Sequence, residues 1–415
     1  MDISIKPTAL KGEVTVPASK TYAHRMLIAA ALADKPTKIM GKFSAKDIVV
    51  TIEAIKAIGA RVEECDGGII VSPIEKVVKG RAIIDACESG STLRFMLPVV
   101  ASIGARTTFF GQGRLGSRPL LDIITTLKQG GISCSGDRLP LTISGKLEGN
   151  VHRIDGSLSS QYITGLMLAE GAKDSGGKII VEGKKVSAAY INNTIEVLKM
   201  FGVDTQTEEY GYNLSGNGYK SPSICKVPSD WSSAAFFAVA GAINGDIKLE
   251  GLSYPSSQAD SAIIGFLRDM GAHITICDNS VTVKKSDLRG LECSITDCPD
   301  LAPVLAVAMA CASGNSVIRD VKRLRIKESD RLQAIINMLA NLGIASKTDG
   351  DNLYITGGRL IGGNVDGCND HRMVMAGVVA GSVAGGTTVV CDSEACAKSY
   401  ADFVEDFMAI GGAIC

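Results

Sequence analysis

Apolar and polar positions follow one short pattern that recurs along the chain. The apolar end of a helical stretch is followed by a glycine, then by a small or β-branched residue, and then by the alternation typical of a strand. Successive copies lie about 70 residues apart. The pattern therefore predicts six similar structural units, centred on Gly59, Gly131, Gly202, Gly271, Gly343 and Gly412.

Each of these glycines is expected just beyond the last residue of a helix, where a left-handed backbone suits a residue without a Cβ atom. The following strand then enters a hairpin, as the turns at Asp66-Gly67-Gly68 and Asp349-Gly350-Asp351 indicate. A unit of this size buries little apolar surface alone. We therefore expect two similar α/β domains of three units each. Chance recurrence of a common helix–glycine–strand junction is the alternative.

The chain is expected to pass from one domain to the other at two segments. The fourth unit begins near Val227-Pro228-Ser229-Asp230, and Pro17-Ala18-Ser19-Lys20 looks like the other crossing. The predicted first domain comprises residues 1–17 and 228–415, and the second comprises residues 18–227. The first strand then belongs with the second half of the chain. Since clefts between domains often hold small ligands, we expect the active site there.

Composition narrows the class of protein. The 415 residues are 46% hydrophobic and 21% charged, as in ordinary soluble proteins. The net charge of −1 and an aromatic content of 5% argue against nucleic acid and anionic membranes as partners. The longest apolar stretch, Leu301 to Ala312, is too short to span a bilayer and contains Pro303.

The cysteines and histidines do not form a metal-binding pattern. The 12 cysteines are scattered without a Cys-x-x-Cys pair, and there are only four histidines. The N-terminal segment reads as strand and turn without the features of a signal peptide. These observations predict reduced thiols, no metal and a cytoplasmic location.

Hydroxyl, Lys and Arg side chains recur where helices are expected to begin. Such positions suit anions, because helix N-termini carry free N–H groups and a partial positive charge. Each motif alone is consistent with ordinary capping or a solvated surface. Their recurrence in a chain without net positive charge instead predicts a polyanionic ligand. The motifs are Ser19–Arg25, Asp85–Arg94, Gly113–Pro119, Ser159-Ser160-Gln161, Ser187 with Tyr190, Asp230–Ser233, Pro299-Asp300, Arg325–Arg331, Asp370-His371-Arg372 and Lys398.

The segment Arg325–Arg331 combines cations with a carboxylate. It precedes a helical pattern of apolar positions, and a helix that began near Glu328 would place Lys327 and Arg331 one turn apart. Two cations and a carboxylate suit an anionic substrate that also gains or loses a proton. A charged first turn with simple ion pairs is the alternative.

The motifs together resemble those of one family. PASKTYAHR, ESGSTLR, GRLGSRP, SSQYITGLML, CPD, RIKESDRL, DHRM and CAKSY occur in the order and spacing of the EPSP synthase (3-phosphoshikimate 1-carboxyvinyltransferase) family, over essentially the whole chain. The resemblance implies the two-domain enolpyruvyl transferase fold, an α/β fold with six βαβαββ units, three in each domain, arranged as an inside-out α/β barrel.

The resemblance also implies a reaction and its substrates. The family transfers the enolpyruvyl group of phosphoenolpyruvate to the 5-hydroxyl of shikimate 3-phosphate, and it needs no cofactor. We therefore expect a monomer with these two small-molecule partners. By the same resemblance, the shikimate 3-phosphate residues are Lys20, Thr21, Arg25, Ser159, Ser160, Ser187, Tyr190, Asp300, Arg323 and Lys327. The phosphoenolpyruvate residues are Lys20, Gly90, Arg118, Gln161, Arg331, Arg372 and Lys398.

The implied reaction needs an acid to protonate a carbon, a base for the hydroxyl and cations over carboxylate and phosphate. We expect Asp300 and Glu328 to be the acid/base pair, with Lys20 and Lys398 as further proton carriers. Three positions depart from the commonest family pattern, of which Thr21 keeps the hydroxyl of the usual Ser. Glu88 stands beside the expected phosphoenolpyruvate site, where it would pair with an arginine that the sequence does not identify, and Arg323 stands where many relatives have Asn.

Two other functions are compatible with parts of this pattern. The enolpyruvyl transferase that acts on UDP-N-acetylglucosamine has the same fold and donor, but its family is expected to show a Lys-Asn pair near the start and a reactive loop Cys. The corresponding segments here read Ser19-Lys20-Thr21 and Gly113–Pro119 without a Cys. A non-catalytic protein that binds phosphorylated metabolites would need the Arg and Ser groups but neither Asp300 nor Glu328.

Overall fold

The computed structural model describes residues 1–78, 80–157, 159–183 and 187–415. The chain divides into two compact units. The discontinuous unit comprises Met1–Ser19 and Pro228–Cys415, and the continuous unit comprises Lys20–Val227. The expected boundaries differ from these by two residues at the first crossing and coincide with them at the second.

The continuous unit contains three four-stranded sheets, with strand orders β14-β3-β5-β4, β6-β7-β9-β8 and β10-β11-β13-β12. Its strands are β3 (Thr37–Met40), β4 (Arg61–Cys65), β5 (Gly68–Ser72), β6 (Ala82–Asp85), β7 (Thr107–Phe110), β8 (Ser133–Cys134), β9 (Leu141–Ser144), β10 (Val151–Asp155), β11 (Gly177–Glu182), β12 (Thr205–Glu208), β13 (Gly211–Leu214) and β14 (Ile224–Lys226). Its helices are α1 (Lys20–Ala31), α2 (Lys46–Ala57), α3 (Gly90–Ser102), the 3₁₀ helix η1 (Gly113–Ser117), α4 (Leu121–Gln129), α5 (Ser160–Gly171) and α6 (Ala188–Met200).

The discontinuous unit repeats this arrangement, with strand orders β22-β23-β1-β24, β16-β17-β15-β2 and β18-β19-β21-β20. Its strands are β1 (Ile3–Lys6), β2 (Leu10–Thr15), β15 (Gly245–Glu250), β16 (His273–Cys277), β17 (Ser280–Lys284), β18 (Glu292–Ser294), β19 (Asn315–Arg319), β20 (Ser346–Thr348), β21 (Asn352–Thr356), β22 (Gly363–Val365), β23 (Thr388–Val390) and β24 (Ala413–Ile414). Its helices are α7 (Trp231–Asn244), η2 (Ala259–Ser261), α8 (Ala262–Asp269), η3 (Pro299–Leu301), α9 (Ala302–Ala310), η4 (Val321–Ile326), α10 (Arg331–Asn341), α11 (His371–Gly381), η5 (Ser393–Lys398) and α12 (Phe403–Ala409).

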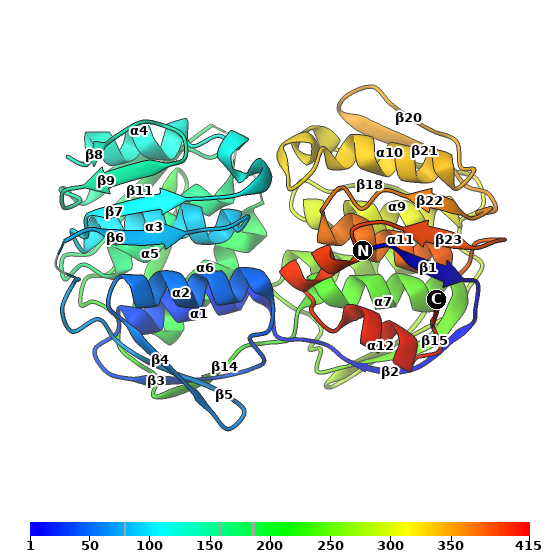
Figure 1. Ribbon diagram of the computed structural model, residues 1–415, viewed down its shortest axis with the longest axis horizontal. Coiled ribbons are helices and arrows are strands. Elements are labelled where there is room, and N and C mark those ends of the chain that lie inside the picture. The colour runs from blue at the N-terminus through cyan, green and yellow to red at the C-terminus, as the bar shows by residue number, and fades with distance from the viewer. Residues whose placement is uncertain (79, 158, 184–186) are drawn as a thin grey trace. The chain divides into compact units, whose positions relative to one another are not determined.

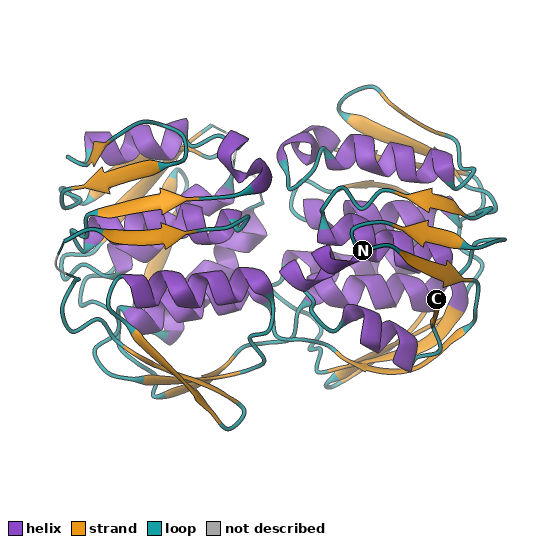
Figure 2. Cartoon of the chain, viewed as in Figure 1, coloured by secondary structure: helices purple, strands orange, loops and turns teal. Residues whose placement is uncertain are grey.

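Each sheet with its helices forms a βαβαββ unit, as predicted (Figure 2). In β6-α3-β7-α4-β8-β9, for example, the first two strands pair in parallel and β9 pairs antiparallel with both β7 and β8. Three units are completed by strands from a distant part of the chain. One of them takes β14, which pairs in parallel with β3. The N-terminal β2 pairs in parallel with β15, and β1 lies between β23 and β24 (Figure 1). The first strands therefore belong to the second half of the chain.

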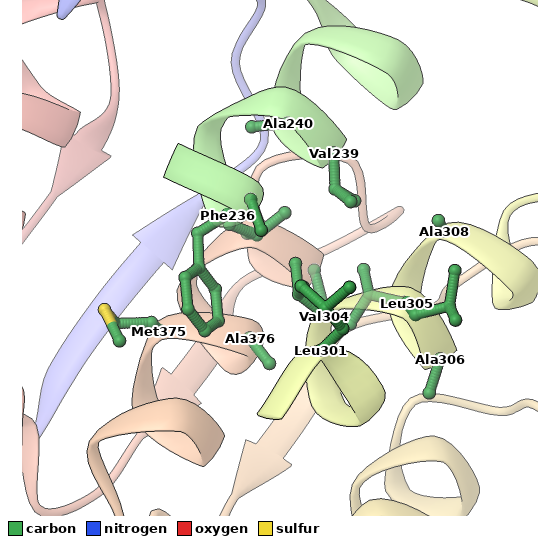
Figure 3. Close-up of a cluster of buried hydrophobic side chains, with 14 of the residues drawn as sticks. Phe236, Val239, Ala240, Leu301, Val304, Leu305, Ala306, Ala308, Met375 and Ala376 are labelled. Atoms are coloured by element: carbon green, nitrogen blue, oxygen red, sulfur yellow. The ribbon is translucent and has the colours of Figure 1, made fainter. Parts of the chain in front are cut away.

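The helices are of two kinds. Those that follow the first strand of a repeat, such as α9, are buried on nearly all sides, whereas those that follow the second strand, such as α4, bury one face. In the discontinuous unit the buried helices α7, α9 and α11 pack against one another. Figure 3 shows Phe236 of α7, Val304 of α9 and Met375 of α11 in this core. This packing fixes the N-termini of the buried helices, where the predicted site residues gather.

The six helix–glycine–strand junctions share one hydrogen-bond pattern. The residue after the glycine donates its N–H to the carbonyl five residues back, as Ala60 does to Ile55 (3.1 Å), and the glycine has a positive φ, as in Gly59. The prediction for the sixth junction is wrong by one residue. There the glycine with positive φ is Gly411, and Gly412 donates to Phe407 (2.9 Å). The sequence offers two adjacent glycines at this point, so the pattern alone does not distinguish them.

Candidate active site

The predicted residues of the continuous unit lie where its helices begin. Lys20 and Thr21 open α1, and Gly90 is the first residue of α3. Ser159 caps α5, since its side chain accepts a hydrogen bond from the N–H of Gln161. Ser160 lies in the first turn of α5, Ser187 at the N-cap of α6 and Tyr190 in the first turn of α6.

Gly90 marks a point where three side chains converge. A Cβ atom at this position would lie 2.6 Å from Arg118 Nη1, 3.4 Å from Arg94 Nη1 and 3.8 Å from Gln161 Oε1. The structure therefore brings together Gly90, Arg118 and Gln161, all three predicted to bind phosphoenolpyruvate. The side chains approach because glycine leaves the space open.

Arg94 belongs to this cluster, although it was not among the predicted site residues. Its Nη1 donates to Gln161 Oε1 (2.6 Å), and Gln161 Nε2 donates to Ser91 Oγ (2.9 Å). Arg94 also lies over the ring of Tyr162, 5.5 Å from its centroid. The motif that contains Gly90 ends with this arginine one helical turn later, so the signal was present in the sequence. Glu88, the unexpected acid, lies against Gly113 of η1, where a Cβ atom would be 2.4 Å from Glu88 Oε1.

Two cations on α1 are engaged by the protein itself. Lys20 Nζ forms an ion pair with Asp47 Oδ2 of α2 (2.9 Å). Arg25 is only 3% exposed, and its guanidinium donates to the side chain of Thr194 (2.8 Å) and to the carbonyls of Thr21 (2.6 Å) and Tyr190 (3.1 Å). In this structure Arg25 joins α1 to α6, so its predicted contact with substrate stays a prediction.

Asp300 is the centre of an ionic network in the discontinuous unit. It lies in η3, which leads into α9. Its Oδ1 is 3.1 Å from Lys327 Nζ and 2.8 Å from Arg331 Nη1, and its Oδ2 is 3.0 Å from Arg372 Nη2. The structure thus unites three cations from two motifs around one predicted catalytic carboxylate.

This network determines the proton affinities at the site. Burial alone raises the pKa of Asp300, but Arg372, Lys327 and Arg331 together hold that pKa well below its ordinary value. Burial is also the main reason why the pKa of Lys327 is lowered, since Asp300 only partly offsets it. In this arrangement Asp300 is ionised but is a weak base, because three cations stabilise its charge.

Arg331 is held on several sides by carboxylates. Its side chain is 1% exposed, with Nη2 2.5 Å from Glu328 Oε2 and Nε 2.7 Å from Asp370 Oδ2. Asp370, the N-cap of α11, also accepts a hydrogen bond from Ser329 Oγ (3.0 Å). Although burial opposes it, these carboxylates raise the pKa of Arg331 well above its ordinary value. Asp370 was noticed only within its Asp-His-Arg motif and was not predicted to belong to the site.

The prediction that a helix begins near Glu328 is wrong. The helix α10 begins at Arg331, with Asp330 as its N-cap, because the Asp330 side chain accepts the N–H of Gln333 (3.1 Å). Lys327 has an extended backbone outside the helix. It therefore reaches Asp300 from a loop and not from the position one helical turn before Arg331.

The last two predicted residues lie in short 3₁₀ helices. Arg323 is half-buried in η4. Lys398 ends η5, and its Nζ donates to the carbonyl of Asn369 (2.6 Å), one residue before the Asp370 cap.

A further buried carboxylate lies beside the network. Asp260 of η2 accepts a hydrogen bond from Ser232 Oγ at the start of α7. Burial and the nearby charge of Asp300 raise the pKa of Asp260 to about 6, with Arg372 partly opposing them. Sequence reasoning missed this residue, because it follows a loop and belongs to none of the helix-start motifs.

Within the described ranges, no cluster of His, Cys, Asp or Glu is arranged to hold a metal ion. All 12 cysteines are among these residues, and each is a free thiol. None of the described helices combines the length and apolar character that crossing a membrane requires.

Solved structures with a similar fold identify the class of protein. The enolpyruvyl transferase NikO from Streptomyces tendae superposes with a TM-score of 0.81, covers 100% of this chain and 98% of its own, and is 18% identical. EPSP synthase from Acinetobacter baumannii superposes with a TM-score of 0.83 at 26% identity, over 100% of this chain and 99% of its own. The fold is that of the enolpyruvyl transferases.

Sequence comparison is more specific. The family model for EPSP synthase (3-phosphoshikimate 1-carboxyvinyltransferase) matches residues 5–407. The 3-phosphoshikimate 1-carboxyvinyltransferase of Clostridium novyi (strain NT) is 37% identical over 426 residues, which span 100% of this chain and 98% of the relative. The chain belongs to the EPSP synthase family.

Proposed function

We propose that this enzyme transfers the enolpyruvyl group of phosphoenolpyruvate to the 5-hydroxyl of shikimate 3-phosphate, with release of phosphate. This is a step toward aromatic amino acids in the shikimate pathway. Membership of the EPSP synthase family supports this reaction. The observation that carries the proposal is the network around Asp300, because it joins a carboxylate to three cations next to a second acid, Glu328.

The reaction requires two proton transfers in each half. In the addition, the substrate hydroxyl loses its proton as its oxygen bonds to C2 of phosphoenolpyruvate, and C3 gains a proton to become a methyl group. In the elimination, the methyl group loses a proton, the C–O bond to phosphate breaks, and the departing phosphate oxygen takes up a proton. We assign the hydroxyl proton to Asp300 and the carbon proton to Glu328. Lys20 and Lys398 serve as further proton carriers.

The low pKa of Asp300 has a consequence for this assignment. Its three cationic partners include Arg331 and Arg372, predicted for phosphoenolpyruvate, and Lys327, predicted for shikimate 3-phosphate. When the substrate anions take up these cations, the carboxylate loses part of its stabilisation, and its pKa rises. Substrate binding then makes Asp300 a better base at the stage when a base is needed.

The substrate sites follow from the same family assignment. We assign phosphoenolpyruvate to Lys20, Gly90, Arg118 and Gln161 of the continuous unit, together with Arg331, Arg372 and Lys398. We assign the phosphate of shikimate 3-phosphate to Ser159, Ser160, Ser187 and Lys327. Thr21, Arg25, Tyr190 and Arg323 are assigned to its ring and carboxylate. The monomeric state and the cytoplasmic location stay predictions.

A phosphate-release assay tests the reaction. The purified chain is given phosphoenolpyruvate with shikimate 3-phosphate, with UDP-N-acetylglucosamine, or alone, and the expected release occurs only with the first pair. Release with the nucleotide sugar would indicate the related transferase, and binding of both ligands without turnover would indicate a binding protein.

A substitution at Glu328 tests the proton assignment. Glu328→Gln keeps the side-chain size but cannot deliver the proton, so we expect kcat to fall about 100-fold. Exchange of the C3 hydrogens of phosphoenolpyruvate with solvent, followed in D₂O, should fall in the same proportion. Turnover of the variant near the wild-type rate would contradict the role of Glu328.

A further inference from the structure

A buried chain of hydrogen bonds connects three helices of the continuous unit. His24 Nδ1 of α1 lies 2.7 Å from Thr51 Oγ1 of α2, which lies 2.6 Å from Thr92 Oγ1 of α3. Thr92 Oγ1 is in turn 2.8 Å from Ser89 Oγ, the N-cap of α3. All four residues are buried, so water does not compete for these bonds.

The protonation state of His24 shows in which direction the first of these hydrogen bonds donates. Burial, together with Lys20 and Arg25, holds the pKa of His24 well below its ordinary value, so the ring is neutral. Among the described residues, its other nitrogen, Nε2, has no hydrogen-bond partner. A buried N–H without an acceptor is rarer in proteins than an unsatisfied acceptor, so the proton belongs on Nδ1. His24 then donates to Thr51, and the hydroxyls of Thr51, Thr92 and Ser89 continue the hydrogen-bonded chain.

The chain runs beside an ion pair that contains a predicted site residue. Lys20 lies one turn before His24 on α1, and its partner Asp47 lies one turn before Thr51 on α2. The Lys20–Asp47 ion pair thus joins α1 to α2, and the neutral His24–Thr51 hydrogen bond joins them one turn further along each helix. The neutral contact continues to α3, where it ends at the residue before Gly90.

We propose that His24 is a positioning residue for phosphoenolpyruvate: through Thr51 and Thr92 it fixes Lys20 of α1 against the start of α3 at Gly90. The proposal rests on the function proposed above. It assigns a role to a side chain that touches neither substrate. Loss of these hydrogen bonds lets the N-terminus of α3 move relative to Lys20. This movement weakens the binding of phosphoenolpyruvate, which both Lys20 and the start of α3 must contact.

Steady-state kinetics of four variants test the role. His24→Leu and Thr92→Val remove donors while keeping the apolar bulk, and we expect each to raise KM for phosphoenolpyruvate about tenfold. KM for shikimate 3-phosphate should change by less than about twofold, because Gly90, at the start of α3 that moves, is assigned to phosphoenolpyruvate alone. His24→Asn retains a donor near the position of Nδ1 and should restore most of the affinity. The fourth variant, Thr37→Val, is the control.

Thr37 is a matched control because it is a buried threonine whose hydroxyl bonds to Ser221 Oγ (2.7 Å), beyond the far end of α1. Its loss should lower the melting temperature as Thr92→Val does but leave both KM values unchanged. If Thr37→Val raised KM for phosphoenolpyruvate as much as Thr92→Val, or if His24→Asn were as impaired as His24→Leu, the positioning role would be wrong.

A measurement without substrates separates this proposal from the proposed function. Nitrogen-15 chemical shifts of the histidine rings distinguish the neutral tautomers from the charged ring, and the His24→Asn variant assigns the signal. We expect the neutral Nδ1–H tautomer from about pH 5 to 8. A protonated ring or the Nε2–H tautomer would contradict the hydrogen-bond chain from His24, even if the enzyme were active. Absence of turnover with the proposed substrates would instead reject the function.

Discussion

The two units share a fold but differ in the chemistry at their helix N-termini. In the continuous unit the predicted residues are mainly hydroxyls, an amide and cations, as with Gln161 and Arg118 beside Gly90. In the discontinuous unit they are cations already paired with carboxylates, above all with Asp300 and Asp370. The same repeated scaffold therefore supports either arrangement, depending on a few residues at each helix start.

The difference indicates that the two units have different roles in the reaction. Hydroxyl, amide and guanidinium donors at helix starts can hold a substrate anion directly. Cations paired with carboxylates must exchange partners when an anion binds, and this exchange changes the proton affinity of the carboxylates. We infer that the continuous unit mainly binds, whereas the discontinuous unit binds and also transfers protons. The following experiments test this comparison.

The largest effect is expected at Asp300. Asp300→Asn keeps the shape but removes the charge that three cations share, so we expect kcat to fall about 1,000-fold. The control is Asp330→Asn, which alters a partly exposed carboxylate paired with Arg325 (3.0 Å) in the same unit and should stay within about twofold. Phosphate release measures both. Equal losses in the two variants would show that general charge balance, and not Asp300, controls turnover.

The next effect is a loss of stability at Asp370. Asp370→Ala leaves the buried guanidinium of Arg331 without its bidentate partner, and we expect the free energy of unfolding to fall by about 3 kcal/mol. Glu292→Ala removes the partner of Arg319 in an exposed pair and should cost less than about 1 kcal/mol. Urea denaturation compares the two. A small effect at Asp370 would mean that Glu328 and Asp300 suffice to hold Arg331.

A smaller effect is expected in the continuous unit at Gly90. The added methyl group of Gly90→Ala would meet the end of the Arg118 side chain, which can move, so the fold should survive while the anion site is disturbed. We expect KM for phosphoenolpyruvate to rise about tenfold with little change in melting temperature. Gly265→Ala on α8, where no atom lies within 4 Å of the added Cβ, should leave KM unchanged. A fall in kcat alone would contradict a binding role for this face.

The smallest effect concerns pH and Asp260. The pKa of this carboxyl is about 6 in the folded chain and 3.8 for an ordinary Asp, so its ionisation destabilises the fold as pH rises between these values. Asp260→Asn should therefore be more stable than the wild type at pH 8. The advantage should shrink below pH 6 and vanish near pH 3.8. Melting temperatures across this range measure it, and an advantage independent of pH would reject the assigned titration.

Local patterns in the sequence were sufficient to predict the repeat and most helix starts. The glycine junctions and the Ser159 cap depend on residues a few positions apart, so their pattern is visible in the chain. Long-range contacts were not predictable in this way. Asp370 meets Arg331 from 39 positions away, and His24 meets Thr51 from 27. The start of α10 at Arg331 was missed because Glu328 and Asp330 are both acceptable residues near a helix start.

The position of β1 has a consequence for synthesis of the chain. The continuous unit has all its strands once residue 227 has been made, so it can fold while the ribosome still holds the rest. The strand β1 leaves the ribosome before the continuous unit but pairs with β23 and with β24, where Ser4 and Cys415 exchange backbone hydrogen bonds of 3.2 and 2.9 Å. Its edges therefore stay unpaired until β23 and β24 have been translated.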